Sequence, residues 1–208
     1  MATLNGKVLD VGAGESPWRE WLSPKASYHG IDIGNAEEFG MHGARRDITY
    51  YDGRTIPFAD ATFDAAICIE VLEHVEQPDL LVAEVARCLK ARAPFIVTVP
   101  WSARRHHIPY DFHRFTRERL EALLAAHGFT QIEIAERGND IGAIASKLVV
   151  LSLRLAPRPK LRSLLTLPFF VLVAPVTALF LLAAHVADMT GAGAAEDPLG
   201  YFVRAVRA

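Results

Sequence analysis

The sequence has few cysteines, and neither belongs to a paired motif. Cys68 and Cys88 are the only two among 208 residues; both stand in apolar surroundings, and no CxxC spacing occurs. The sequence therefore supports neither a disulfide-stapled scaffold nor a cysteine-based zinc site, and it favours a reducing compartment. We expect no metal ligand among the functional residues.

An excess of charge of one sign is also missing. The 22 lysines and arginines nearly balance 24 aspartates and glutamates, which leaves a net charge of −2. A nucleic-acid-binding domain usually carries a basic excess, so that class is disfavoured. The first residues lack the basic stretch and apolar run of a signal peptide, and we expect the folded part to face the cytoplasm. With 51% hydrophobic and 22% charged residues, disorder is excluded.

Short apolar runs alternate with helical patterns over the first two thirds of the chain. Runs of this kind suit strands that are buried on both faces of a parallel sheet. The expected strands are residues 7–11, 28–33, 63–69, 95–99, 129–135 and 201–206. Helices are expected from Ser16–Pro17 onward, at 78–89 and at 116–127. This alternation predicts an α/β fold with a doubly wound, mostly parallel sheet.

One segment near the C-terminus has a different composition. Residues 164–184 run for 21 positions without a charge, and a helix of that length is about 30 Å long, the thickness of a bilayer's hydrocarbon core. Pro168 and Pro175 lie inside it and predict a kink or break. An apolar stretch at 141–155 precedes it, and the basic residues between the two include Arg158, Lys160 and Arg162.

A glycine turn follows the first expected strand. Gly12 and Gly14 in residues 9–14 (LDVGAG) allow a ligand to approach the backbone closely. A dinucleotide-binding fingerprint needs a third glycine where Pro17 stands, so that fingerprint fails. Asp32 ends the second expected strand, where a carboxylate can accept hydrogen bonds from both hydroxyls of a ribose. Taken alone, the glycine turn and Asp32 each also fit an ordinary turn between a strand and a helix.

Five motifs in register resemble the class I S-adenosylmethionine-dependent methyltransferases. They are residues 10–14 (DVGAG), 30–32 (GID), 56–58 (IPF), 63–64 (FD) and 70–74 (EVLEH). The resemblance covers about residues 5–135. It implies a Rossmann-like methyltransferase sheet with an antiparallel last strand, and S-adenosyl-L-methionine as cofactor.

The same resemblance implies which residues line the cofactor. Asp10, Gly12 and Gly14 would face its methionine part, and Asp32 its ribose. Either Asp47 or Asp52 would lie near the adenine; Asp52 keeps the usual spacing to residues 56–58, but the sequence does not separate the two. The residues expected beside the sulfonium are Ile69, Glu70 and Val71. Glu73 and His74 are expected to begin the next helix.

The acceptor side is expected in residues 101–115, after a strand's carboxyl end, where open α/β sheets bind ligands. This loop gathers three histidines, three arginines, an aspartate and four aromatic residues. The alternative is a partly buried aromatic loop with solvated charges. Similar stretches occur in relatives that act on glycans or lipid-linked molecules. Candidate bases are His106, His107, Asp111 and His113, and candidate substrate-binding residues are Arg104, Arg105, Tyr110 and Arg114.

The family topology makes the apolar segment an insertion between the last two strands. The expected division is a methyltransferase core at 1–138, a helical insertion at 139–192 and a returning strand at 193–208. Because both flanking strands belong to one sheet, a single membrane crossing is excluded, which leaves a dipping helix pair or two crossings. A basic cluster beside an apolar helix suits anionic headgroups. A buried helix pair or a dimer interface is the alternative.

These features together predict a methyltransferase that acts in line on a nucleophilic nitrogen or oxygen of a lipid or lipid-linked acceptor. We expect it on the cytoplasmic side of the inner or plasma membrane, peripheral or monotopic. Two alternatives stay open: a soluble small-molecule or sugar methyltransferase that forms a homodimer through the apolar segment, and a non-catalytic membrane-anchored binding module. No nucleic-acid partner is expected, because the chain lacks both a basic face and the Asn/Asp-Pro-Pro-aromatic motif used on flipped bases.

Overall fold

The computed structural model describes residues 1–15, 17–34, 47–157 and 165–208. The chain forms two compact units. The core unit comprises Met1–Pro100, Arg104–Ala135 and Tyr201–Ala208, and the helical unit comprises Trp101–Ala103 and Glu136–Gly200. Ser16, where a helix was expected to open, and the basic residues Arg158, Lys160 and Arg162 lie outside the described residues.

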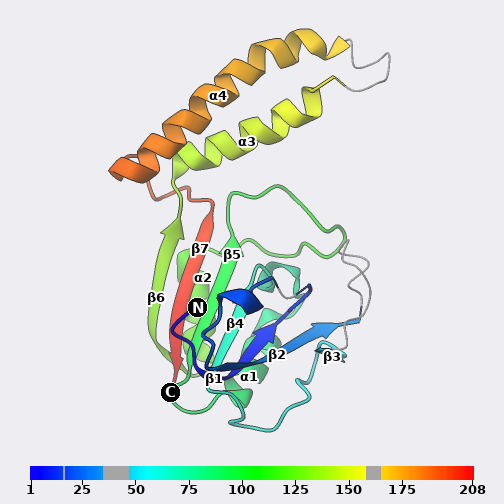
Figure 1. Cartoon of the computed structure of the whole chain (residues 1–208), viewed down its shortest axis with the longest axis vertical. Helices are drawn as coiled ribbons and strands as arrows, with labels where there is room; N and C mark the ends of the chain where they lie inside the picture. Colours follow the sequence, from blue (N-terminus) through cyan, green and yellow to red (C-terminus); the bar gives the residue numbers. More distant parts are fainter. Residues whose placement is uncertain (16, 35–46, 158–164) are drawn as a thin grey trace. The chain divides into compact units, whose positions relative to one another are not determined.

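Seven strands form one mixed sheet in the order β3-β2-β1-β4-β5-β7-β6 (Figure 1). The strands from β3 to β5 pair in parallel. The last strand runs antiparallel to β5, because the amide of Arg207 bonds the carbonyl of Ala93 before β5, and the amide of Trp101 after β5 bonds the carbonyl of Leu199 before β7. The expected fold class is confirmed. The strands are β1 (Gly6–Val11), β2 (Ala26–Ile33), β3 (Ile48–Tyr51), β4 (Ala65–Ile69), β5 (Pro94–Pro100), β6 (Phe129–Arg137) and β7 (Gly200–Arg207).

The central strands are buried along nearly their whole length. All five residues of β4 and the last four of β1 are buried, as continuous apolar runs require. Helices α1 (Pro78–Cys88) and α2 (Arg117–Ala126) lie behind the sheet in Figure 1. The hydroxyl of Thr116 caps α2 by accepting a hydrogen bond from the amide of Arg119 at 3.2 Å. The sheet therefore has a rigid core below its carboxyl edge.

Three short elements differ from the sequence-based expectations. Strand β3 was not predicted, because its four residues stand in a polar stretch too short to show a period. A 3-10 turn, η1 (Arg19–Trp21), stands where a longer helix was expected. A second one, η3 (Leu72–His74), is separate from α1, since Val75 is extended and Pro78 opens the helix. The expectation that Glu73 and His74 begin that helix is therefore wrong.

The helical unit is an antiparallel pair, α3 (Asp140–Leu155) and α4 (Leu167–Thr190). Asn139 caps α3 through its side-chain oxygen, which accepts the amide hydrogen of Gly142 at 3.0 Å. The hydroxyls of Ser152 and Thr177 lie 2.7 Å apart and tie the two helices together. Helix α4 continues through Pro175, so the expected break is absent.

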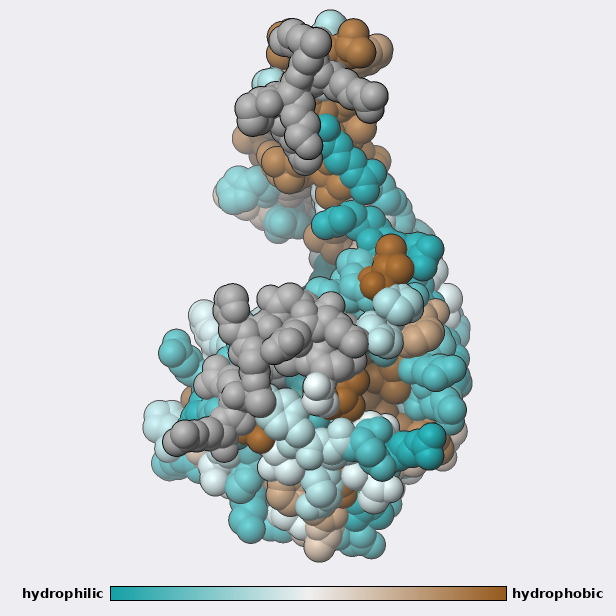
Figure 2. Space-filling model, turned by 90° about the vertical axis from the view of Figure 1, so that its right-hand side faces the viewer, coloured by the Kyte–Doolittle hydropathy of each residue, from teal (hydrophilic) through white to brown (hydrophobic). Residues whose placement is uncertain are grey.

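The surface of α4 is strongly apolar. It is the one helix in the described part of the chain that is long and apolar enough to span a membrane, with a mean hydropathy of 2.4 over 18 residues, of which 6% are buried. Hydrophobic side chains gather over both helices in Figure 2. The exposed large apolar residues of this unit include Leu151, Leu153, Phe169, Val171, Leu172, Leu179, Leu181, Leu182, Val186 and Met189.

Candidate functional site

The glycine turn after β1 is held against the residue pair that follows β4. Gly12 and Gly14 have φ values of +69° and +51°, which favour glycine. A Cβ atom placed on Gly12 would lie 2.5 Å from Cγ2 of Val71. The structure therefore brings two motifs, about 60 residues apart in sequence, into direct contact at the carboxyl edge of the sheet.

Asp32 lies beside this turn, at the end of β2. Its Oδ2 accepts a hydrogen bond from the amide of Gly14 at 2.7 Å, and its Oδ1 accepts one from the amide of Ile33 at 2.7 Å. Each carboxylate oxygen has two acceptor sites, so capacity remains for hydroxyl groups of a ligand. Burial raises the pKa of Asp32 despite these two hydrogen bonds.

Asp10 is buried under the turn, with 1% of its surface exposed. The hydroxyl of Tyr28 donates to its Oδ2 at 2.8 Å. Burial raises the pKa of Asp10 to about 7, and the hydrogen bond from Tyr28 opposes that rise. Sequence reasoning missed Tyr28, which no motif marks.

The raised pKa of Asp10 predicts a pH-dependent stability. Between about pH 4 and pH 7 the folded chain retains a proton that the unfolded chain releases, so this stabilisation is present below pH 4 and is lost as the pH rises to 7. The variant Asp10→Asn keeps an acceptor for Tyr28 but does not titrate. We expect it to be more stable than the wild type at pH 8 by up to about 4 kcal/mol, because a shift of about three pKa units corresponds to about 1.4 kcal/mol per unit. Thermal melts from pH 4 to 8 without cofactor measure this; parallel curves would contradict it.

The chain makes an unusual turn immediately after β4. Glu70 has a φ of +56°, a left-handed conformation that costs a non-glycine residue energy and is concentrated at functional sites. Its amide bonds the carbonyl of Thr98 at 3.0 Å. Ile69, Glu70 and Val71 therefore lie at the same edge as the glycine turn.

The two candidate adenine-binding aspartates flank β3 at opposite ends. Asp52 follows the carboxyl end, and its Oδ1 accepts the amide hydrogens of Arg54 and Thr55 at 2.9 and 3.1 Å. Asp47 precedes the strand and forms an ion pair with Arg19 at 2.7 Å. Since β3 is parallel to β2, Asp52 lies at the same edge of the sheet as the carboxyl end of β2.

Three histidines meet next to this edge. His74 of η3 lies against His106 and His107 of the loop, with ring centroids 4.8 to 5.2 Å apart. Burial lowers the pKa of both His74 and His107, so these two rings are neutral at physiological pH. His106 and His107 were expected at the acceptor side; His74 was not.

Glu73 is buried beside the histidines, with no exposed surface. Neither of its carboxylate oxygens has a hydrogen-bond partner among the described residues. Burial raises the pKa of this carboxyl to about 8. Sequence reasoning missed its role; the one available signal was a charged residue between the apolar Leu72 and Val75.

The remaining loop candidates are largely engaged with one another. Arg114 donates to both oxygens of Asp111 at 2.6 and 3.0 Å, and this contact lowers the pKa of Asp111 to about 2. Asp111 also accepts the amide hydrogen of His106. His113 has a buried Nε2 without a partner in the described residues. Arg104 and Arg105 are exposed, and the carbonyl of Tyr110 bonds His74.

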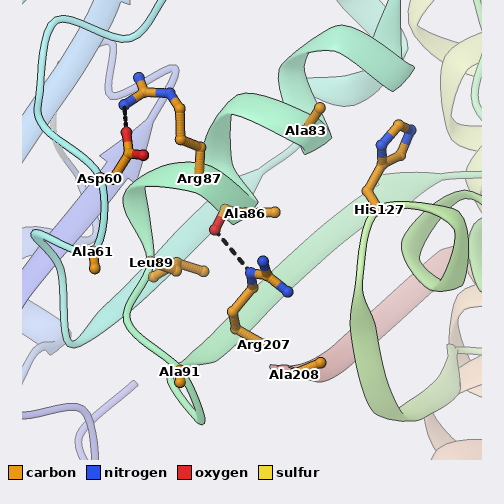
Figure 3. A pocket seen from close by; sticks show the side chains of 10 residues that line it. All are labelled: Asp60, Ala61, Ala83, Ala86, Arg87, Leu89, Ala91, His127, Arg207 and Ala208. Carbon is orange, nitrogen blue, oxygen red and sulfur yellow. Dashed lines mark hydrogen bonds and ion pairs between the residues drawn. The ribbon is translucent and has the colours of Figure 1, made fainter.

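A cavity of about 500 Å³ lies elsewhere in the core unit (Figure 3). It is lined by residues next to the amino ends of β5 and β6 and the end of β7. Its cations are already paired: Arg87 contacts Asp60 at 2.7 Å, and Arg207 donates to the carbonyl of Ala86 at 2.9 Å. None of the motif residues lines it, so the candidate site is the carboxyl edge and not this cavity.

Comparison with known proteins identifies a family match for the first half of the chain. Residues 9–97 match the methyltransferase domain family. A phosphatidylethanolamine N-methyltransferase of Cereibacter sphaeroides is 29% identical over 102 residues, which are 44% of this chain and 50% of that protein. A ubiquinone biosynthesis O-methyltransferase of Hahella chejuensis is 36% identical over 101 residues, 44% of this chain and 42% of that protein. The chain thus spans about half the length of the curated relatives it matches.

Solved structures share the fold at low identity. The [4+2]-cyclase SpnF superposes with a TM-score of 0.58 at 22% identity, covering 99% of this chain and 76% of that one. A Haemonchus contortus phosphoethanolamine N-methyltransferase 2 in complex with S-adenosyl-L-methionine gives 0.53 at 16% identity, covering 98% and 49%. Because a cyclase is among these neighbours, the fold alone does not set the reaction.

The cofactor of this family is S-adenosylmethionine, and the described residues fit it. Asp32 retains acceptor capacity for ribose hydroxyls beside the amide of Gly14, and the left-handed backbone of Gly12 and Gly14 forms the turn at the same edge. The resemblance seen in the motifs is confirmed: residues 9–97 belong to the methyltransferase domain family, and the chain has the fold of the class I S-adenosylmethionine-dependent methyltransferases.

Proposed function

We propose that this chain transfers a methyl group from S-adenosylmethionine to a nucleophilic nitrogen or oxygen of a lipid or lipid-linked acceptor at a membrane surface. The observation that carries the lipid part is the exposed apolar surface of α4, in the same chain as the glycine turn and Asp32. A 24-residue helix with this hydropathy and so little burial needs an apolar environment.

We assign the cofactor-binding residues from their positions at the carboxyl edge of the sheet. Asp10 and the glycines face the methionine part, Asp32 binds the ribose hydroxyls, and the residues after β4 lie beside the sulfonium. Asp52 is the adenine-side aspartate in this proposal, because it follows β3 at the same edge as Asp32, whereas Asp47 is paired with Arg19.

The reaction demands alignment more than chemical assistance. When bound, S-adenosylmethionine supplies a methyl group that is already activated by a positive sulfur. The protein holds the acceptor in line, and orientation of this kind can contribute about 7–11 kcal/mol. An acceptor hydroxyl or ammonium must also lose a proton. His107, whose pKa burial lowers, or His113, whose buried Nε2 has no partner in the described residues, suits that task better than Asp111, whose lone pairs Arg114 and the amide of His106 already use.

The insertion point supports a hairpin in the membrane. The helical unit joins β6 to its neighbour β7, and these strands run in opposite directions, so the chain leaves and re-enters the sheet at one edge. A pair of antiparallel helices, and not a single crossing, meets this condition. The two relatives are named for N-methylation of phosphatidylethanolamine and for an O-methylation in ubiquinone biosynthesis, and both of these compounds are lipids.

Transfer of radiolabelled methyl into a total cell extract tests the acceptor class. The full chain and labelled S-adenosylmethionine are incubated with the extract, which is then split with organic solvent. We expect label in the organic phase. Label confined to the aqueous phase would support the alternative, a soluble small-molecule or sugar methyltransferase with the apolar segment as a dimer interface, and no transfer would support a non-catalytic binding module.

A further inference from the structure

The three-histidine cluster next to the cofactor edge has a geometry that packing alone does not require. One ligand nitrogen from each of His74, His106 and His107 lies within 4.8 Å of the other two. The residues come from two segments, η3 and the loop after β5, which the fold brings together. Neutral imidazoles gathered in this way are the usual ligands of divalent transition metals.

A buried carboxylate completes the cluster. Oε1 of Glu73 lies 3.7 Å from Nε2 of His74 and 3.9 Å from Nε2 of His106. Glu73 has no exposed surface, and no hydrogen-bond partner for its carboxylate is found in the described ranges. A buried carboxyl group without a partner is either protonated or, when it carries its charge, paired with a cation such as a metal ion.

Hydrogen bonds from the Nδ1 atoms of His74 and His106 orient the Nε2 atoms of the two rings toward the Glu73 carboxylate. Nδ1 of His74 lies 2.6 Å from the carbonyl oxygen of Tyr110, and Nδ1 of His106 lies 3.1 Å from that of Arg104. A carbonyl only accepts, so each Nδ1 carries the hydrogen, and Nε2 is the nitrogen of each ring that can offer a lone pair to a metal. Histidine ligands of metals are commonly fixed by such a hydrogen bond to a carbonyl.

We propose that Glu73, His74, His106 and His107 bind one divalent transition metal of the zinc class. Tetrahedral zinc with bonds of about 2.0–2.1 Å places its ligand atoms about 3.3 Å apart. The separations of 3.7 and 3.9 Å from Glu73 need little closure, whereas the histidine nitrogens, which lie within 4.8 Å of one another, move closer together when the metal binds. A nitrogen-rich set favours zinc or cobalt over magnesium. Four protein ligands make a closed site, which would fasten the loop to η3.

A histidine nitrogen that binds the metal has no lone pair left to act as a general base. In the metal-bound protein, His106 and His107 are ligands, and His113 is the remaining histidine of the loop. The site itself does not depend on the proposed function, because metal binding is measured without S-adenosylmethionine or an acceptor. Failure of one proposal therefore leaves the other standing.

Cobalt binding to the full, metal-stripped chain tests the site through its visible absorption. We expect one Co²⁺ per chain, displaced by Zn²⁺, and at least a tenfold weaker affinity in His106→Ala and Glu73→Gln. His107→Ala, at an exposed position, serves if the Glu73 variant does not fold. The control is His127→Ala at the end of α2, which we expect to bind like the wild type. Equal affinity of wild type and His106→Ala, or no stoichiometric binding by the wild type, would overturn the proposal.

Discussion

Replacing Asp32 with alanine is expected to weaken the binding of S-adenosylmethionine about a hundredfold or more and to reduce methyl transfer in proportion. A hydrogen bond to a charged group contributes about 1.5–3 kcal/mol, and two ribose hydroxyls would be lost together. Each 1.4 kcal/mol is about tenfold in affinity. The amide of Gly14 also loses its acceptor, so the turn itself becomes less well fixed.

Two further variants separate these contributions. Asp32→Asn keeps a neutral acceptor for the amide of Gly14, and we expect an intermediate affinity with little change in melting temperature. Asp79→Ala removes an aspartate on α1 whose partners are Arg119 and His127, and we expect wild-type affinity. Isothermal titration with S-adenosylmethionine or its demethylated product measures all three. Wild-type affinity in Asp32→Ala would show that the cofactor does not use this carboxylate.

Placing two glutamates on the apolar surface of α4 is expected to release the protein from membranes. Leu172 and Leu179 are 68% and 64% exposed, so the double variant Leu172→Glu/Leu179→Glu creates no buried charge in the folded chain. A carboxylate at the centre of a bilayer costs about 2.5–3.5 kcal/mol, which predicts at least a hundredfold lower partitioning for two. Sedimentation with liposomes of anionic lipid measures the effect.

A substitution of the same kind in the core unit controls for the chemistry of the change, although it adds one negative charge and not two. Leu80 on α1 is 52% exposed, and Leu80→Glu should leave sedimentation unchanged. If the double variant still sediments with liposomes, α4 is not the anchor. If the wild type is a detergent-free soluble dimer and the double variant a monomer, the apolar surface is a subunit interface instead.

The sheet was largely predictable, because its buried strands consist of short runs of apolar residues. Strands β1 and β4 are buried on both faces, and so they appear in the sequence as continuous apolar stretches. Strand β3 has four residues and one buried side chain, which is too little for a period to emerge. The unbroken course of α4 through Pro175 was also beyond the local pattern, which predicts a break wherever an internal amide is missing.

The cofactor residues of the site were predictable from the sequence, whereas the contacts around Glu73 were not. Gly12, Gly14 and Asp32 stand at fixed distances from strand ends, so the spacing of the motifs located them. The partners of Glu73 depend on the loop that follows β5: the amides of Phe112 and His113 donate to the carbonyl of Glu73 at 2.8 and 3.1 Å. No motif spacing in the sequence predicts that contact.

The sequence by itself determined the order of the strands other than β3, the helices α1 and α2, the cofactor motifs and the apolar insertion, because each depends on residues that are near one another in the chain. Only the tertiary structure decided that Tyr28 supports Asp10 and that the buried Glu73 faces His106 of the loop after β5. These pairings depend on side-chain distances between segments that lie apart in sequence, and such distances are fixed only when the sheet has assembled and the loop has packed against its edge.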